Sequence, residues 1–304
     1  MLKTQIQGSL VALVTPMKGD GSIDLETFDQ LLDWHIDAGT HGIVVVGTTG
    51  ESATLSTEEH CNLVGHCVDK VAGRVPVIAG TGSNNTEEAL FFTRSAKAHG
   101  ADACLLVTPY YTKPPQEGLY RHFRLIAEQV DIPQILYNVP GRTVCDLSLE
   151  TVDRLADVDN IVAIKDATGD FERGVELIAR CADRIAVFSG EDPLNVALMK
   201  AGARGCISVT ANVVPAAMAK ICDMALSGDM AAAQSLDERI AGLHKNLFLQ
   251  ANPIPVKWAL LRMGLIKDGI RLPLVELAEQ YRLQVEQALG GAGVELPAST
   301  NQAR

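Results

Sequence analysis

The chain has 304 residues, of which 47% are hydrophobic and 21% charged, a composition typical of a packed globular protein. A formal net charge of −11 argues against the basic surface that nucleic-acid binding requires. No stretch approaches the roughly 18 apolar residues of a membrane helix, and the N-terminal segment lacks the apolar core and cleavage site of a signal peptide. We therefore predict a cytoplasmic protein that binds neither nucleic acid nor membrane.

Short runs rich in β-branched residues alternate with helical stretches along most of the chain. The runs are near-continuously apolar, which indicates strands buried on both faces, as in a parallel sheet. The runs span residues 9–16, 42–50, 75–82, 103–111, 134–141, 161–168, 185–192 and 205–212. The stretches between them carry apolar residues at helical spacing. One of these helices is expected to begin at Ser56 or Thr57 as its N-cap and to end at Gly73.

Successive strand–helix units predict an α/β fold, a closed (β/α)8 TIM barrel. An open doubly wound sheet is the alternative, but no glycine-rich dinucleotide fingerprint follows the first run. After Pro215 only helical stretches follow. They span about 215–227, 230–249, 254–263 and 274–289. We predict a catalytic barrel over residues 1–228 and a C-terminal helical domain over 229–304 that ends in a mobile tail.

Seven cysteines are scattered along the chain without a CxxC pair. An odd number of scattered cysteines is typical of reduced thiols that fill core positions. The alternative is a nucleophilic cysteine, for which no supporting motif is present. His60 and His66 are six residues apart, a spacing that does not suit one helix face. We therefore predict no metal site.

The run IVAIKDAT at 161–168 encloses Lys165 in strand-forming residues. A charged amine inside an apolar strand costs several kcal/mol unless it is paired, neutralised or used. In such a barrel, active-site groups lie at the carboxyl ends of the strands. Burial lowers the pKa of an amine, and a neutral amine attacks a ketone to form a Schiff base. The alternative is a structural lysine that pairs with Asp166.

Other runs end in hydroxyl groups suited to the same chemistry. Thr48 and Thr49 end the second run, Tyr110 and Tyr111 end the fourth, and Tyr137 lies in the fifth. Because these ends meet at one mouth of the barrel, we expect the side chains to converge. A Schiff-base reaction needs a proton shuttle, and a tyrosine held by threonine hydroxyls suits that task.

Two further motifs are suited to binding anions. GTTGES presents glycine-flanked backbone amides that bind either a phosphate or a carboxylate, and it lacks the lysine of a P-loop. Arg142 follows the fifth run, where a guanidinium is suited to a bidentate grip on a substrate carboxylate. The alternative for Arg142 is a solvated surface arginine.

Five motifs in combination resemble the dihydrodipicolinate synthase family, within the N-acetylneuraminate lyase superfamily of Schiff-base aldolases. They are GTTGESATLS, VTPYYTKPPQEGLYRHF, ILYNVPGRT, IKDATGD, and SGED followed by GCISVTANV. NPIPVKWAL at 252–260 matches the helical extension of that family, and the resemblance runs in order from about residue 4 to 290. It implies a barrel with a C-terminal helical extension.

The resemblance implies a Schiff base between Lys165 and pyruvate, with no other cofactor. Tyr137 would then relay protons and position the imine. Thr48 would link Tyr137 to Tyr111, which in this family reaches in from a neighbouring subunit. The family assembles as a homotetramer of tight dimers, so activity would depend on assembly.

The resemblance also implies how the substrates are held. Thr49, with backbone amides of its turn, would bind the pyruvate carboxylate, and Arg142 would bind that of L-aspartate 4-semialdehyde. Gly190 and Ile207 would line the pyruvate pocket. The implied reaction condenses the two substrates to 4-hydroxy-tetrahydrodipicolinate, the first committed step of the diaminopimelate route to lysine.

Two alternatives remain for the function. Sialic-acid lyases and related aldolases or dehydratases of the superfamily share the lysine and the tyrosine, but the threonine pair and Arg142 favour the synthase. A non-catalytic barrel that binds a small molecule is a second alternative. The presence of Lys165, Tyr137 and Arg142 together argues against it.

Lysine-inhibited members of the family bind lysine at the dimer interface. The residues that match that site are Ser52, Ala53, His60, Asn84, Glu88 and Tyr110. Thr57 stands where strongly inhibited members often carry His, so the resemblance leaves lysine inhibition open.

Overall fold

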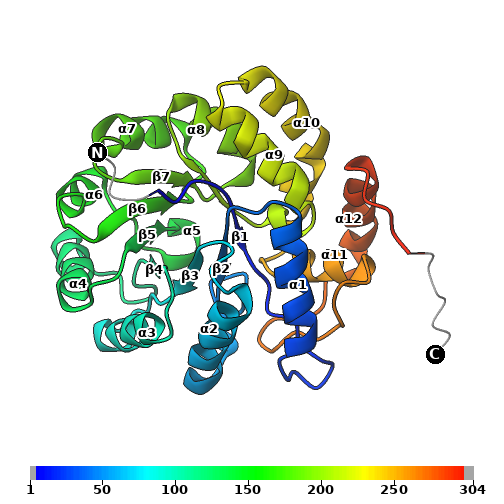
Figure 1. Cartoon of the computed structure of the whole chain (residues 1–304), viewed down its shortest axis with the longest axis horizontal. Helices are drawn as coiled ribbons and strands as arrows, with labels where there is room; N and C mark the ends of the chain where they lie inside the picture. Colours follow the sequence, from blue (N-terminus) through cyan, green and yellow to red (C-terminus); the bar gives the residue numbers. More distant parts are fainter. Residues whose placement is uncertain (1–4, 298–304) are drawn as a thin grey trace.

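A computed structural model describes residues 5–297, which form a closed barrel of eight parallel strands surrounded by helices (Figure 1). The strands follow one another around the barrel in chain order, and the last pairs with the first. They are β1 (Gly8–Ala12), β2 (Gly42–Val45), β3 (Val77–Gly80), β4 (Ala103–Val107), β5 (Gln134–Asn138), β6 (Ile161–Asp166), β7 (Ala186–Ser189) and β8 (Gly205–Ser208). The predicted TIM barrel is confirmed.

Helices form an outer ring around the strands (Figure 1). The ring contains α1 (Leu25–Asp37), α2 (Thr57–Val71), α3 (Thr86–Ala98), α4 (Gln116–Gln129), α6 (Leu149–Leu155), α7 (Phe171–Cys181), α8 (Asn195–Ala201) and α9 (Pro215–Leu226). Short helices follow four of the strands: η1 (Ser52–Thr54), α5 (Pro140–Thr143), η2 (Asp192–Leu194) and η3 (Thr210–Asn212). Nowhere in residues 5–297 is a helix long and apolar enough to cross a membrane.

The strands are shorter than the apolar runs that predicted them. Each run continues past its strand into the loop at the carboxyl end; β2, for example, ends at Val45, whereas its run extends to residue 50. Side chains that alternate along the strands fill two apolar layers, one inside the barrel and one between the strands and the helices. The polar residues at the ends of the runs are thereby left at the mouth of the barrel.

Helix α2 shows how local sequence defines an element boundary. Of the two N-cap candidates, the structure uses Ser56, whose hydroxyl accepts a hydrogen bond from the Glu59 amide at 3.2 Å. The Glu59 carboxylate accepts in return from the Ser56 amide at 2.8 Å, which completes a capping box. The helix ends at Val71, and its C-cap Ala72 lies one residue before the predicted Gly73.

All seven cysteines are free thiols, and six of them are buried. Burial raises the pKa of Cys67 and of Cys104 to about 12. A raised pKa opposes the thiolate form that nucleophilic catalysis needs. The thiols therefore fill the core, as the scattered spacing predicted.

Three helices follow the barrel: α10 (Met230–Asn246), α11 (Ile254–Arg262) and α12 (Glu279–Gly291). Helix α10 packs against α9 and α12, so the extension is continuous with the outer ring (Figure 1). The proposed domain division near residue 228 falls in the turn between α9 and α10 and stays a prediction. The last helix begins at Glu279 instead of residue 274. Nearly all of the predicted tail lies outside the described residues.

A buried histidine joins α10 to the barrel. His244 lies with Nε2 3.2 Å from Asp237 Oδ1 and Nδ1 2.9 Å from the hydroxyl of Thr210, which follows β8. Burial disfavours the imidazolium form of His244. The hydrogen bond to Asp237 and the negative charges of Asp192 and Asp237 outweigh burial, so the pKa of His244 is raised.

The raised pKa predicts how stability depends on pH. The imidazolium of His244 contributes its full stabilisation below the ordinary histidine pKa, and the contribution is lost as pH rises through the raised folded-state value. We expect the difference in free energy of unfolding between the wild type and His244→Gln to shrink as pH increases from about 6 to 9. Urea unfolding across this range measures it. A difference that grew with pH would contradict the assignment.

Candidate active site

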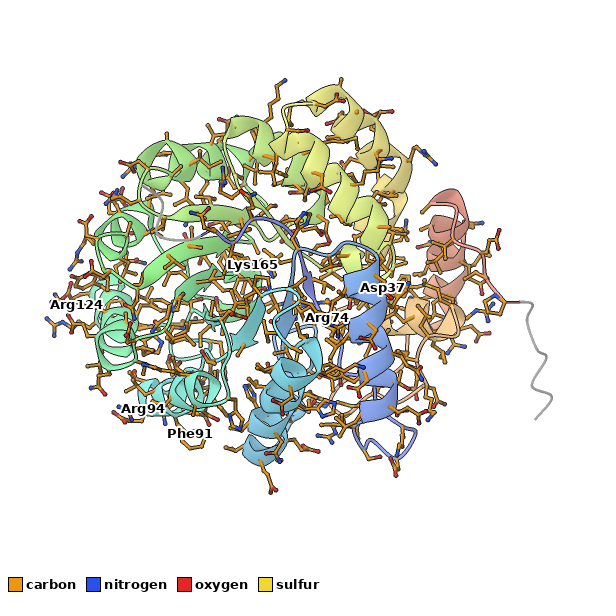
Figure 2. The ribbon with its side chains drawn as sticks, in the orientation of Figure 1. Asp37, Arg74, Phe91, Arg94, Arg124 and Lys165 are labelled. Carbon is orange, nitrogen blue, oxygen red and sulfur yellow. The ribbon has the colours of Figure 1, made fainter. Side chains whose placement is uncertain are left out.

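A pocket of about 50 Å³ opens at the carboxyl ends of the strands, inside the barrel mouth. A volume of this size has room for about three to five water molecules. Lys165 projects into it near the centre of the molecule, inside the ring of helices (Figure 2). The lining residues come from the strand ends and from the segment before α11: Ala12, Val44, Gly47, Thr48, Thr49, Leu105, Tyr137, Val139, Arg142, Lys165, Ala167, Gly190, Glu191, Val209, Phe248 and Asn252.

Lys165 lies near the end of β6, opposite Tyr137 of β5 in the parallel register. Its side chain is buried, and Nζ lies 4.4 Å from the centroid of the Tyr137 ring. The next residue, Asp166, points to the other face of the strand. There its carboxylate pairs with Arg173 at 3.1 Å and accepts the Thr168 hydroxyl at 2.6 Å. The structural alternative, a Lys165–Asp166 pair, is therefore wrong.

Gly190 makes room for the lysine side chain. A Cβ at this position would lie 2.6 Å from the Ala167 Cβ, 2.9 Å from the Asp166 carbonyl oxygen and 3.0 Å from the Lys165 Cε. These contacts are too short for any side chain larger than hydrogen. Glycine at the end of β7 therefore allows the backbone to pass directly beside the amine.

The turn that contains Thr48 and Thr49 presents unused donors to the pocket. The hydrogen bonds of residues 5–297 include none in which the amide N–H of Thr48 or of Thr49 donates. Backbone amides without a protein acceptor are able to bind an anion. The Thr49 hydroxyl oxygen, in contrast, accepts a hydrogen bond from Asn252 Nδ2 at 2.9 Å. The pair is thus suited to holding a small anion beside Lys165.

Arg142, on α5, lies at the rim of the same pocket. Its Nη2 donates to the Asn252 carbonyl oxygen at 3.1 Å, which anchors the guanidinium across the mouth. Within residues 5–297 it forms no ion pair, so the remaining donors of its planar fork are available to a ligand. Arg142 is exposed and also lines the pocket, so its role in binding a carboxylate stays a prediction.

Glu191 is the one carboxylate that lines the pocket. Burial raises its pKa, and the nearby Asp192 adds to the increase. The positive charges of Lys165 and Arg142 oppose it. A carboxyl group whose pKa is raised by burial in a cleft, beside an amine, is a candidate for holding a proton in the site.

Two of the predicted site residues lie outside the pocket of the single chain. Tyr111 is 87% exposed and has a φ of +71°, so its ring lies on the surface in a strained backbone conformation. Ile207 is fully buried inside the barrel, in the apolar cluster that also contains Tyr137. The roles of both residues stay predictions.

The six residues predicted for lysine regulation follow three neighbouring strands. Ser52 and Ala53 lie in η1 after β2, Asn84 and Glu88 follow β3, and Tyr110 follows β4. His60, on α2, donates from Nε2 to the Gly80 carbonyl oxygen at 2.9 Å and stacks on Phe92. Burial lowers the pKa of His60, although the Gly80 contact and the charge of Glu88 oppose the shift. The regulatory assignment stays a prediction.

No group of three or more His, Cys, Asp or Glu side chains with the geometry of a metal site occurs in the part of the chain from residue 5 to 297.

The sequence matches the dihydrodipicolinate synthetase family over residues 5–292. The chain belongs to this family. A protein named 4-hydroxy-tetrahydrodipicolinate synthase from Marinobacter nauticus is 59% identical, over 95% of this chain and 99% of that one. A second one from Thioalkalivibrio sulfidiphilus is 57% identical, over 96% of this chain and 99% of that one.

Solved structures of the family superimpose closely on this fold. The chloride-inhibited dihydrodipicolinate synthase from Acinetobacter baumannii, complexed with pyruvate, matches with a TM-score of 0.95 and 55% identity, over 96% of this chain and 100% of that one. The enzyme from Cyanidioschyzon merolae with lysine bound matches with a TM-score of 0.92 and 37% identity, over 95% and 99% of the two chains. The predicted family is confirmed, and the chain is an enzyme. The sialic-acid lyase alternative is not favoured.

Sequence reasoning missed two polar residues of the pocket. Asn252 lies about 100 residues beyond Arg142 in the chain, and no strand end marks it; NPIPVKWAL indicated only the helical extension. Glu191 follows β7 directly, so the rule that selected the other strand ends also pointed to it. A closer analysis of the SGED motif would have found Glu191, whereas Asn252 needed the tertiary structure.

Proposed function

We propose that this enzyme condenses pyruvate with L-aspartate 4-semialdehyde through a Schiff base on Lys165. The activity is that of a 4-hydroxy-tetrahydrodipicolinate synthase, a lyase of the diaminopimelate route to lysine, which acts in the cytoplasm. The observation that carries the proposal is the buried amine of Lys165, 4.4 Å from the Tyr137 ring, in a pocket that also holds free amides and a guanidinium.

Pyruvate enters first and binds with its carboxylate on the amides of Thr48 and Thr49. Their N–H groups, unused within residues 5–297, support this role. The keto carbon then lies within reach of Lys165, whose amine attacks it and expels water to form the imine. Tyr137 moves the proton that the departing oxygen needs. No other cofactor takes part.

The iminium acidifies the methyl group of the bound pyruvate, and loss of a methyl proton yields an enamine. The enamine carbon attacks the aldehyde of L-aspartate 4-semialdehyde. Arg142 binds the carboxylate of this second substrate through its free guanidinium donors, since it forms no ion pair in the described chain. Ring closure by the substrate's amino group displaces Lys165 and frees the enzyme.

Activity also depends on assembly. Tyr111 is 87% exposed on the single chain, and in a homotetramer of tight dimers it enters the site of a neighbouring subunit to complete the Thr48–Tyr137 proton relay. Its positive φ of +71° supports a functional constraint on this tyrosine. The Cyanidioschyzon merolae relative binds lysine, which supports lysine as the ligand of the predicted regulatory site around His60 and Glu88.

The first test concerns the amine. Borohydride added together with pyruvate should inactivate the enzyme and leave a reduced pyruvyl adduct on Lys165, located by peptide mass spectrometry. Lys165→Ala should be inactive and unlabelled because no other amine lines the pocket within the described residues. An adduct on a different lysine would contradict the assignment.

The second test separates proton relay from packing. Tyr137→Phe keeps the ring against the Lys165 amine and removes only the hydroxyl, so the fold should survive. Turnover should fall by a factor on the order of 10² or more. Steady-state kinetics measure the loss. An unchanged kcat would show that Tyr137 only packs against its neighbours and does not relay protons.

The third test assigns the second substrate to Arg142. A charge-assisted bidentate contact contributes roughly 2–3 kcal/mol, so Arg142→Ala should weaken the use of aspartate semialdehyde about 10²-fold. Arg142→Lys should recover only part of this loss because it lacks the planar fork. Borohydride trapping of pyruvate should stay near normal in both variants. Loss of pyruvate trapping with retained affinity for the semialdehyde would reverse the assignment of the two sites.

A further inference from the structure

The turn between β2 and η1 is held in a strained conformation. Two residues without glycine's freedom have positive φ angles, Val46 at +49° and Glu51 at +57°. Such conformations cost about 1–3 kcal/mol each and persist only where the surroundings enforce them. Thr48 and Thr49, which line the pocket, lie between these two residues. Whatever holds Val46 and Glu51 therefore sets the direction of the amides.

The Val46 end of the turn is held by close packing on β3. A Cβ on Gly80 would lie 2.4 Å from the Val46 carbonyl oxygen, so the two backbones are in direct contact. Backbone contact of this kind explains the first strained residue, and it explains why residue 80 has no side chain. It does not reach the other end of the turn.

The Glu51 end is held by an ion pair with the C-terminal extension. The Glu51 side chain is 0% exposed, and one carboxylate oxygen pairs with the Nζ of Lys257, a residue of α11 that is 5% exposed. The other oxygen accepts the backbone N–H of Arg271 at 3.2 Å. A carboxylate buried this completely requires such partners. Both partners lie more than 200 residues away along the chain.

Arg271 extends the contact to the neighbouring elements. Its guanidinium pairs with both carboxylate oxygens of Glu59 at 2.6 and 2.8 Å and donates to the carbonyl oxygens of Thr54 and Gly21 at 2.8 Å. The hydrogen bond with Arg271 lowers the pKa of Glu59 to about 2. In Figure 1 the chain after α11, coloured orange, passes beside α1. The extension thus braces η1 and the start of α2 as well as the turn.

We propose that Glu51 and Lys257 are positioning residues for the pyruvate site. Their buried ion pair holds the Glu51 end of the strained turn, so that the amides of Thr48 and Thr49 point at the substrate carboxylate. The C-terminal extension is therefore part of the binding machinery of the barrel, although Lys257 does not line the pocket. This inference rests on the proposed function, since it assumes that these amides bind pyruvate.

A merely stabilising role would give a different result from a positioning role. Removing one partner of a buried ion pair leaves an unpaired charge and destabilises the fold, whereas replacing both partners by neutral groups often restores stability. If the ion pair only stabilises the fold, the double variant should therefore recover both its stability and its affinity for pyruvate. If the ion pair positions the turn, the double variant should recover its stability but not its affinity for pyruvate, because its neutral side chains no longer hold the turn.

The experiment compares Lys257→Met, Glu51→Gln and the double variant with the wild type. Each is measured for its thermal midpoint and for the pyruvate concentration that gives half-maximal inactivation by borohydride. Lys267→Met is the matched control: Lys267, in the same C-terminal segment, pairs with Asp24 at 2.7 Å and is 59% exposed. We expect this control to keep wild-type half-saturation.

We expect the double variant to recover most of the midpoint lost by the single variants, while its half-saturation for pyruvate stays about 10-fold or more above the wild type, as small misplacement of binding groups produces. Trapping at saturating pyruvate should remain complete. Wild-type half-saturation in the double variant would overturn the inference. If that variant does not fold, Glu51→Asp replaces it in the test, because aspartate keeps the charge but has a shorter side chain. Wild-type half-saturation for pyruvate in Glu51→Asp would then overturn the inference. Failure of the wild type to be trapped would overturn the proposed function itself.

Discussion

The parallel pairing of β5 with β6 is the constraint on which the chemistry depends. It places Tyr137 directly opposite Lys165, with the amine 4.4 Å from the ring centroid. Alternation along β6 sends Asp166 to the outer face, where Arg173 neutralises it. The amine is thus left in the barrel without a carboxylate partner from its own strand. An unpaired, buried lysine is expensive, and the catalytic role that we propose for Lys165 gives a reason for its presence there.

The barrel alone does not make the pocket. Asn252, just before α11, donates to the Thr49 hydroxyl and accepts from Arg142, so it ties together the two groups that we assign to the two substrate carboxylates. Lys257 and Arg271 hold Glu51 from the same C-terminal segment. The helices after the eighth strand therefore complete a site whose reacting residues all come from the barrel.

Strained backbone positions occur around the proposed site. The positive φ angles of Val46 and Glu51 flank the threonine turn, and another occurs at Tyr111. A fold held together by eight parallel strands and two apolar layers tolerates such local costs, because the surrounding packing enforces them. Three of the strained positions thus lie beside or at the amides and the tyrosine to which we assign roles in the reaction.

By itself the sequence determined the barrel, the order of its strands and the strand ends that carry Lys165, Tyr137 and the threonine pair. These follow from local patterns: apolar runs form strands, and parallel strands present their carboxyl ends at one mouth. Alternation along a strand also places Asp166 on the opposite face from Lys165. Only the tertiary structure decided that Asn252 and Lys257 reach the pocket wall and the turn behind it. The reason is physical, because contacts between residues 203 and 206 positions apart depend on how helices pack, and no local periodicity records that packing.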